Sequence, residues 1–284
     1  MNGSEYNGGD REFVFTPADF ARIRDLVKRD TGISLSDAKQ NMVYSRLSRR
    51  LRQLGMETFD EYLDQLDGGD QEELVNFVNA ITTNLTAFFR EPHHFEFLGG
   101  TLIPALVAAK ARDRRLRIWS AGCSSGEEPY SIAIVVKECL PAGQHWDAKI
   151  LATDLDSNMV AKARSGVYTE ERVAGLSANR LHRWFRRGRG GNAGMVKVAP
   201  ELQELISFRE LNLMHEWPLR GPLDVIFCRN VVIYFDKQTQ RRLFERYADL
   251  LAPEGHLFIG HSESLFKVTD RFEPLGNTIY RKIK

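Results

Sequence analysis

Apolar residues recur at helical spacing from Thr16 to about Arg90, which predicts that the first part of the chain is made of helices. Thr16 followed by Pro17 is typical of a helix N-cap and first turn, and Gly32 is expected to end that helix. Asp70 is expected to open a long helix. Two further helices are predicted over 36–54 and 59–66, each followed by a glycine turn. The pattern therefore predicts a small all-helical domain.

After about Arg112 the pattern changes to short apolar runs separated by helical segments. This alternation is typical of a mostly parallel sheet that is covered on both faces. The predicted strands are 116–120, 149–153, 206–210, 224–228, 256–259 and 278–282. Little helix separates the last two, so an antiparallel pair is expected to end the sheet. A Gly-rich basic stretch between Trp184 and Val198 predicts a small β hairpin insertion.

These changes of pattern predict an α/β, Rossmann-like fold preceded by a small all-helical domain. We expect a disordered polar tail over 1–12, the helical domain over 13–91, a connecting helical segment over 92–112, and the α/β domain over 113–284 with its β insertion at about 183–210.

The charge, the cysteines and the lack of targeting patterns limit the kinds of partner and the location that we expect for this protein. The net charge is only +1, so the overall charge attracts neither nucleic acid nor a membrane surface. Cys123, Cys139 and Cys228 have unrelated spacings and form no CxxC pair, so we expect reduced cysteines and no metal. The sequence has no signal-peptide pattern, no apolar run of membrane-spanning length and no heptad repeat. We therefore expect a cytoplasmic monomer that does not insert into a membrane.

A glycine turn between a strand and a helix is the most informative segment, from Arg117 to Pro129. It lacks the full GxGxxG of dinucleotide sites, and no lysine follows its second glycine as in a P-loop. Glu127 and Glu128 stand there instead. They would repel a pyrophosphate but suit a sulfonium, an amino group and hydroxyls, which favours S-adenosylmethionine over NAD or ATP. A plain turn with acidic residues at the helix start also fits.

Two later strands also end in polar residues. Asp154 follows the strand 149–153, where nucleoside-binding sheets carry a carboxylate for the ribose hydroxyls, although Asp154 or Asp156 also fits as a helix cap. Asn230 and Tyr234 follow the strand 224–228 and would face the reactive end of the cofactor, although Tyr234 also fits as a half-buried core aromatic. The Asp-Pro-Pro-Tyr-like motif of DNA adenine methyltransferases is absent, because two valines replace the prolines.

Five ordered stretches together resemble the CheR family of chemotaxis receptor methyltransferases. They are TNLTAFFRE at 83–91, GCSSGEEPYS at 122–131, ATDLD at 152–156, Asn212-Leu213, and FCRNVVIYFD at 227–236. The resemblance extends from about Phe13 to Lys284. It implies a helical amino-terminal domain and an S-adenosylmethionine-dependent catalytic domain that methylates glutamate side chains of chemoreceptors, with S-adenosylhomocysteine as the other product.

The resemblance also implies a set of site residues. Asn84, Thr86 and Arg90 are expected to reach the cofactor from the first domain. The rest of the pocket is expected to come from Gly122, Glu127, Asp154, Asn212, Leu213, Asn230 and Val231.

The expected chemistry needs no general base. A glutamate side chain has an ordinary pKa near 4.3, so at neutral pH it is already an anionic nucleophile. The enzyme must instead align the carboxylate oxygen, the methyl carbon and the sulfur in a dry site. We expect Arg90 to orient the carboxylate or to secure the cofactor, and Tyr234 to line the transfer site, although Arg90 also fits as the cap of its own helix end.

Two further segments are candidates for partner binding. Lys39, Arg46, Arg49 and Arg50 cluster on one side of the second helix and suit an acidic receptor helix, although a solvated charged face explains them nearly as well. Gly188, Gly190 and Gly194 lie in a stretch that resembles family members that dock a short peptide from the receptor's carboxyl terminus.

Two other classes of function share some of these features. A nucleic-acid methyltransferase would use the same sheet and cofactor, but the near-zero charge and the missing motif argue against nucleic acid as a partner. A non-catalytic module that binds the cofactor as a signal would lack methyl transfer altogether.

Overall fold

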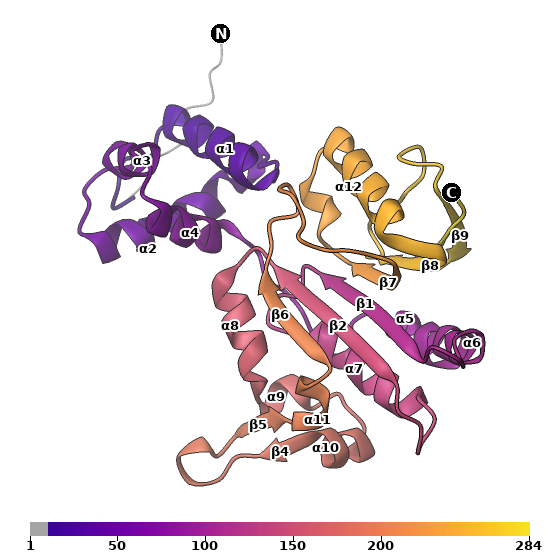
Figure 1. Ribbon diagram of the computed structural model, residues 1–284. Coiled ribbons are helices and arrows are strands. Elements are labelled where there is room, and N and C mark those ends of the chain that lie inside the picture. The colour runs from indigo at the N-terminus through magenta and orange to yellow at the C-terminus, as the bar shows by residue number, and fades with distance from the viewer. Residues whose placement is uncertain (1–10) are drawn as a thin grey trace. The chain divides into compact units, whose positions relative to one another are not determined.

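The computed structural model describes residues 11–284, and the chain divides into two compact units between Thr82 and Thr83 (Figure 1). Most of the predicted tail, 1–10, lies outside the described residues. The segment 83–91, assigned above to the helical domain, belongs to the second unit. One reason is that it bonds to the α/β fold, for example from the Phe89 N–H to Ser131 Oγ at 3.0 Å. In the part of the chain that the structure describes, no helix is long and apolar enough to cross a membrane.

The first unit is helical, as predicted. Its helices are α1 (Pro17–Thr31), α2 (Gln40–Leu54) after the short 3-10 turn η1 (Asp37–Lys39), α3 (Phe59–Asp67) and α4 (Gln71–Ile81). Thr16 caps α1 by accepting the Asp19 N–H, and Gly32 ends it in a left-handed conformation with φ of 74°. Asp70 caps α4 in the same way by accepting the Glu73 N–H.

The second unit is organised around a mixed sheet. Its strands are β1 (Arg115–Ala121), β2 (Asp147–Asp154), β6 (Ile206–Glu210), β7 (Leu223–Cys228), β8 (Leu251–Ile259), β9 (Phe272–Gly276) and β10 (Ile279–Lys282). They lie in the order β6-β2-β1-β7-β8-β10-β9, parallel from β6 to β8 and antiparallel beyond. The predicted strands and the antiparallel end are confirmed. The sequence does not predict β9, because Pro274 interrupts its short pattern.

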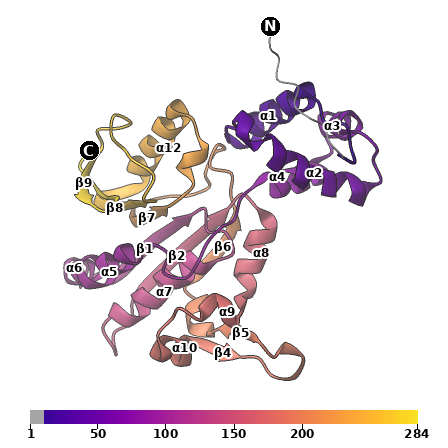
Figure 2. The same cartoon turned by 180° about the vertical axis from the view of Figure 1, so that it is seen from behind.

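Helices cover both faces of this sheet (Figures 1 and 2). On one face lie α7 (Glu127–Cys139), α8 (Ser157–Ser165) and a continuous helical stretch made of α5 (Pro92–Phe97), the π-helical turn η2 (Leu98–Leu102) and α6 (Ile103–Ala109). The other face carries α12 (Lys237–Leu250). Side chains of β1 point alternately to the two faces of the sheet, as in any strand. Ile118 packs in the core on the α7 face, whereas the centroid of the Trp119 ring lies 5.4 Å from that of Tyr247 on α12.

A smaller antiparallel sheet forms the predicted insertion (Figure 2). Its strands are β3 (Val167–Thr169), β4 (Phe185–Arg187) and β5 (Met195–Val198), with β5 in the centre. The short helices α9 (Glu170–Val173), α10 (Ala178–Trp184), η3 (Gly190–Asn192) and α11 (Pro200–Gln203) flank them. The predicted hairpin is present as β4 and β5. The insertion nevertheless starts earlier than about 183, because β3 pairs with β5 in the same small sheet. The sequence does not predict β3, since the strand is too short to show alternation. The insertion also ends before β6, which pairs with β2 in the main sheet.

Candidate functional site

The carboxyl ends of β2, β1 and β7 lie side by side along one edge of the main sheet. The chain leaves β1 towards α7 on one face and leaves β7, through the 3-10 turn η4 (Val232–Tyr234), towards α12 on the other. Such a reversal opens a crevice at which open α/β sheets bind their ligands. The polar residues predicted at these strand ends therefore converge.

The turn after β1 is shaped by glycine. Gly122 has φ of 93°, and a Cβ atom there would lie 2.4 Å from Cγ2 of Val231. Only glycine therefore lets this turn approach the loop after β7 so closely. The N–H groups of Gly122 and Cys123 both donate to the Thr153 carbonyl at 2.8 Å, which fixes the turn beside the end of β2.

Glu127 and Glu128 are buried in the first turn of α7, and both carboxylates have partners from the chain. Glu127 accepts Ser125 Oγ at 2.6 Å and Arg172 Nη2 at 2.5 Å. Glu128 accepts Ser120 Oγ at 2.7 Å, and burial raises its pKa. Glu127 is fully buried, and its partner Arg172 has a side chain that is 38% exposed.

Asp154 presents a carboxylate at the end of β2. Its Oδ2 accepts the Ser124 N–H at 2.7 Å, and its Oδ1 accepts the Asp156 N–H at 2.9 Å. Burial raises the pKa of Asp154 to about 6. The cap of α8 is Asp156, whose side chain accepts the N–H groups of Asn158 and Met159. Asp154 is therefore not that cap, and each of its oxygens keeps capacity for another hydrogen bond.

Asn230 joins the loop after β7 to the segment that carries Arg90. Its Oδ1 accepts Arg90 Nη2 at 3.1 Å, and its N–H donates to Glu263 Oε2 at 3.0 Å. Arg90 Nη1 also donates to the Leu85 carbonyl at 2.8 Å. Arg90 is thus held at the sheet edge by a loop carbonyl and an amide rather than by a helix end. Tyr234 is half-buried in η4, in the same loop as Asn230.

The remaining predicted cofactor residues lie around the same edge. Asn84 Nδ2 donates to Asp156 Oδ2 at 2.7 Å, and the Asn84 carbonyl accepts Ser124 Oγ at 3.3 Å. The Leu211 N–H donates to the Asp154 carbonyl at 2.9 Å, which brings the Asn212-Leu213 pair next to β2. Thr86 is half-buried and lies in the chain between Asn84 and Arg90.

Arg229 and Glu91 are functional candidates that sequence reasoning missed. The Arg229 side chain is only 2% exposed and lies 3.3 Å from Glu91 Oε2 and 3.1 Å from Glu128 Oε2. Burial alone would raise the pKa of Glu91, but His261 and Arg229 lower it to about 2. The position of Arg229 directly after a buried apolar strand could have indicated this pair, because a buried arginine needs carboxylate partners.

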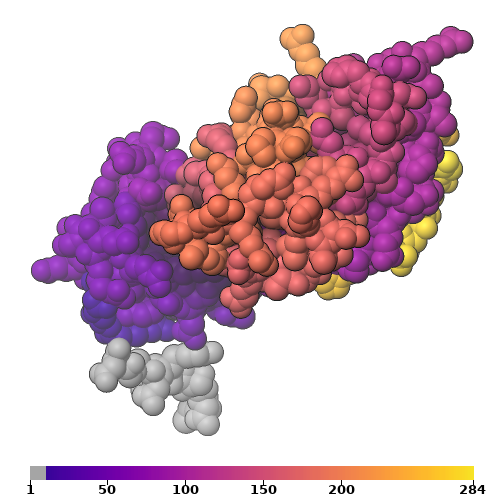
Figure 3. Space-filling model, turned by 90° about the horizontal axis from the view of Figure 1, so that it is seen from below, coloured from indigo at the N-terminus to yellow at the C-terminus, as the bar shows by residue number. Residues whose placement is uncertain are grey.

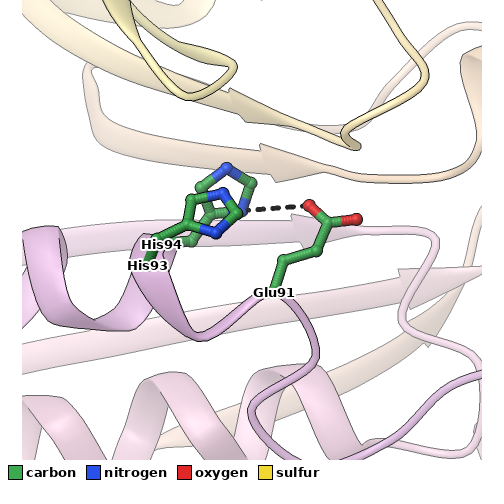
Figure 4. A group of neighbouring side chains, drawn as sticks. All are labelled: Glu91, His93 and His94. Carbon is green, nitrogen blue, oxygen red and sulfur yellow. Dashed lines mark ion pairs between the residues drawn. The ribbon is translucent and has the colours of Figure 1, made fainter.

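Glu91, His93 and His94 come together at the start of α5, with ligand atoms that all lie within 4.8 Å of one another (Figure 4). His94 Nδ1 is 3.5 Å from Glu91 Oε2. Burial lowers the pKa of His94 to about 4, and the Arg229 charge adds to this. The same guanidinium would repel a metal cation at Glu91. We therefore interpret Glu91 as the ion-pair partner of Arg229 rather than as a metal ligand.

Both units match domains of one family. Residues 18–82 match the CheR methyltransferase, all-alpha domain, and residues 84–281 match the CheR methyltransferase, SAM binding domain. The chain belongs to the CheR methyltransferase family. This confirms the resemblance inferred from the motifs and makes the protein an S-adenosylmethionine-dependent methyltransferase.

Curated relatives of this CheR chain are similar over nearly its whole length. Chemotaxis protein methyltransferase 2 of Pseudomonas aeruginosa is 49% identical over 273 residues, which cover 96% of this chain and 95% of the relative. The chemotaxis protein methyltransferase of Escherichia coli is 44% identical over 270 residues, 94% and 91% of the two chains. That of Salmonella typhimurium is 44% identical over 273 residues, 95% and 92%.

The basic residues predicted on the second helix of this CheR chain differ in their surroundings, and Lys39 lies in η1 whereas the three arginines lie in α2. Arg46 Nη1 donates to the carbonyls of Ile81 at 2.6 Å and Thr82 at 2.7 Å. Arg50 forms an ion pair with the buried Glu73. Lys39 and Arg49 are exposed. The predicted stripe is therefore divided between two arginines that hold the first unit together and two cations that face solvent.

The predicted glycines of the CheR insertion form a tight hairpin turn. A Cβ atom at Gly188 would lie 2.1 Å from the Asn192 carbonyl oxygen, and Gly190 and Gly194 have φ of 59° and 82°. The Gly188 N–H donates to the Met195 carbonyl at 2.8 Å. These glycines are therefore required by the turn itself.

Proposed function

We propose that this CheR-family chain transfers the methyl group of S-adenosylmethionine to glutamate carboxylates of chemoreceptors, forming glutamate methyl esters and S-adenosylhomocysteine for sensory adaptation. The supporting observation is the convergence of Asp154, Asn230 and Arg90 at one sheet edge. This set offers a carboxylate, an amide and a cation. It suits a nucleoside cofactor and an anionic substrate that needs no general base.

The residues at this edge fit the cofactor. Asp154 keeps lone pairs for ribose hydroxyls, and the glycine turn at Gly122 allows the ligand to lie against backbone. The Asn230 amide lies across the crevice on the loop after β7. Bound S-adenosylmethionine supplies an electrophilic methyl group whose carbon–sulfur bond breaks as the carbon–oxygen bond to the carboxylate forms. The protein therefore has to position and dehydrate the substrate carboxylate, and no proton moves.

Arg90 is our candidate for orienting that carboxylate. A guanidinium has five N–H donors, and the bonds to Leu85 and Asn230 fix its orientation while leaving donors for a bidentate pair. We expect Arg90→Ala to lower kcat by about 10²- to 10³-fold while circular dichroism stays unchanged. Arg90→Lys keeps the charge but loses the fork, so it should recover little activity. Wild-type turnover in Arg90→Ala would refute this role.

Binding measurements separate the two roles that remain open for Arg90. If Arg90 orients the substrate, its replacement leaves the Kd for S-adenosylhomocysteine unchanged. If it secures the cofactor, that Kd rises. Tyr234, which we place beside the transfer site, is tested by Tyr234→Phe, which removes only the hydroxyl group; a change in kcat without a change in cofactor affinity supports contact with the reacting groups.

The acceptor is tested directly on the receptor. Purified enzyme, S-adenosylmethionine and a receptor cytoplasmic fragment are incubated, and the modified peptides are mapped by mass spectrometry. Methylation confined to glutamates, and lost when those glutamates are replaced by alanine, supports the proposal. Methyl groups on lysine or on co-purified nucleic acid contradict it, and cofactor binding without any transfer favours the sensing module instead.

Receptor helices are proposed to dock on η1 and α2 of the first unit. The exposed cations Lys39 and Arg49 are suited to steer a glutamate-rich helix, whereas Arg46 and Arg50 serve the fold. Charge reversal at Arg49 is therefore a cleaner test of docking than reversal at Arg46 or Arg50.

A receptor carboxyl-terminal peptide is proposed to bind beside β4. This strand is an edge of the small sheet, so its outward backbone groups are available for an added strand. A groove of about 1420 Å³ beside it includes the cations Lys137, Arg183, Arg186, Arg187 and Arg189 together with Trp184 and Phe185. Figure 3 views the second unit from the side on which this insertion lies. An acidic peptide that ends in a carboxylate fits this lining.

Fluorescence anisotropy with a labelled receptor-tail peptide tests this docking. We expect Arg186→Glu with Arg187→Glu to weaken binding, and Lys149→Glu, an exposed charge reversal on β2, to leave it unchanged. If the Arg186→Glu, Arg187→Glu variant and the Lys149→Glu variant bind the peptide equally well, the groove is not the docking site. The cytoplasmic location, the monomeric state and the lack of a metal requirement stay predictions.

A further inference from the structure

Glu263 is a buried carboxylate that follows β8 and faces the loop after β7. Its side chain accepts the N–H groups of Gly260 at 2.5 Å, Asn230 at 3.0 Å and Ile233 at 3.3 Å. The residue is only 6% exposed, and within residues 11–284 the structure shows no ion pair for it. A buried charge held by backbone N–H groups fixes the backbone that donates them.

The loop that Glu263 holds is seated tightly against two neighbouring strand ends. A Cβ atom at Gly260 would lie 2.9 Å from Cγ of Asn230, and one at Gly122 would lie 2.4 Å from Cγ2 of Val231. Asn230 has φ of 59°, a conformation that non-glycine residues keep only when their surroundings enforce it. The direction of the Asn230 amide is therefore set by its neighbours.

The same turn also reaches the segment that carries Arg90. The His261 N–H and Nδ1 lie 3.3 Å and 2.8 Å from Glu91 Oε1, and Glu91 directly follows Arg90 in the chain. One turn after β8 thus bonds both to the Asn230–Tyr234 loop, through Glu263, and to the residue beside Arg90, through His261.

We propose that Glu263 is a positioning residue for methyl transfer, which sets the place of Asn230 and Tyr234 at the cofactor site by holding the backbone of their loop. This inference rests on the proposed role of Asn230 in cofactor binding. In this proposal Glu263 acts through that loop, to which its carboxylate is hydrogen-bonded. Burial raises its pKa, and the backbone N–H groups that donate to the carboxylate act against that rise.

The test compares Glu263 variants with a control carboxylate on α12 that bonds to the same connection after β8. Glu263→Ala removes the three bonds, whereas Glu263→Gln keeps one acceptor oxygen. The control is Glu245→Gln, because Glu245 accepts Thr269 Oγ1 at 2.7 Å and Arg271 Nη1 at 3.2 Å, so it holds the chain after β8 without touching Asn230. Asn230→Ala serves as the reference for losing the amide itself.

Calorimetric titration with S-adenosylhomocysteine gives the decisive readout. A residue needed only for folding lowers the binding stoichiometry and leaves Kd unchanged, whereas a positioning residue raises Kd at unchanged stoichiometry. We expect Glu263→Ala to raise Kd at least tenfold, Glu263→Gln to raise it less, and Glu245→Gln to leave it unchanged. The KM for S-adenosylmethionine should follow Kd, while the KM for the receptor fragment stays constant.

Each contrary outcome is informative. If Asn230→Ala weakens binding but the Glu263 variants do not, the positioning role fails and the cofactor role of Asn230 survives. If Asn230→Ala leaves Kd unchanged, the cofactor role of Asn230 and the positioning role of Glu263 are both refuted. If Glu263→Ala does not fold, an unchanged Kd in Glu263→Gln is sufficient to overturn the inference.

Discussion

The proposed contact of Asp154 with the ribose predicts that cofactor binding depends on pH. Burial raises the pKa of its carboxyl from the ordinary 3.8 to about 6, a difference that corresponds to about 3 kcal/mol for ionising it in the folded protein. Because the folded pKa lies above the unfolded value, the stability contribution of this carboxyl is full below about pH 4 and is lost as the pH rises through about 6. Ribose hydroxyls that donate to the carboxylate favour its ionised form.

The measurement is the Kd for S-adenosylhomocysteine by calorimetry between about pH 5 and pH 8. We expect a constant Kd above the pKa of Asp154, near 6, and a rise approaching tenfold per pH unit below it, with proton release on binding. Asp154→Asn keeps the shape but cannot titrate. Its affinity at high pH should be about 10- to 100-fold weaker and nearly independent of pH.

The variant also controls for other carboxyls near the site. Burial raises the pKa values of Glu128 and Glu263 too, and both remain in Asp154→Asn. A wild-type Kd that is flat across this range would refute the assignment of Asp154 to the ribose. If the Kd of Asp154→Asn depends on pH as steeply as the wild-type Kd, one of those other carboxyls causes the effect.

Three further predictions concern stability and docking. Arg49→Glu should raise the receptor KM several-fold and weaken the salt dependence of that KM. Because the side chain is exposed, the free energy of unfolding in urea should change by no more than about 0.5 kcal/mol. Unchanged kinetics would show that α2 does not take part in docking. Arg50→Glu should destabilise the first unit by about 3–5 kcal/mol, because it leaves the buried Glu73 facing a like charge; an unchanged urea midpoint would contradict this. Gly122→Ala should cost about 1–3 kcal/mol and weaken cofactor affinity, because its Cβ meets Val231 at 2.4 Å; wild-type affinity would show that the turn adapts.

Much of the fold can be read from local patterns, because alternation and capping are properties of neighbouring residues. Thr16, Gly32 and Asp70 mark helix ends in the sequence and in the structure. β3 and β9 could not be predicted, because the first spans too few residues and the second contains Pro274. Both strands form because other strands offer them hydrogen bonds, which no local pattern reveals.

The site was predictable where residues follow strands and unpredictable where distant residues pair. Asp154 and Asn230 stand at strand ends, and parallel strands bring such ends to one edge. The bond of Glu263 to Asn230 joins residues 33 positions apart, and nothing local indicates it. Arg50 looked like a surface cation for the same reason, because the periodicity of α2 does not show that α4 offers Glu73.

The central claim is that the product is a glutamate methyl ester on a chemoreceptor. The most direct measurement incubates the enzyme with S-adenosylmethionine labelled in its methyl group and with receptor-enriched membranes, and then treats the washed protein with mild alkali. We predict that the label is released as methanol, because carboxyl methyl esters hydrolyse in alkali. Label that stays on the protein or on nucleic acid after this treatment would contradict the account.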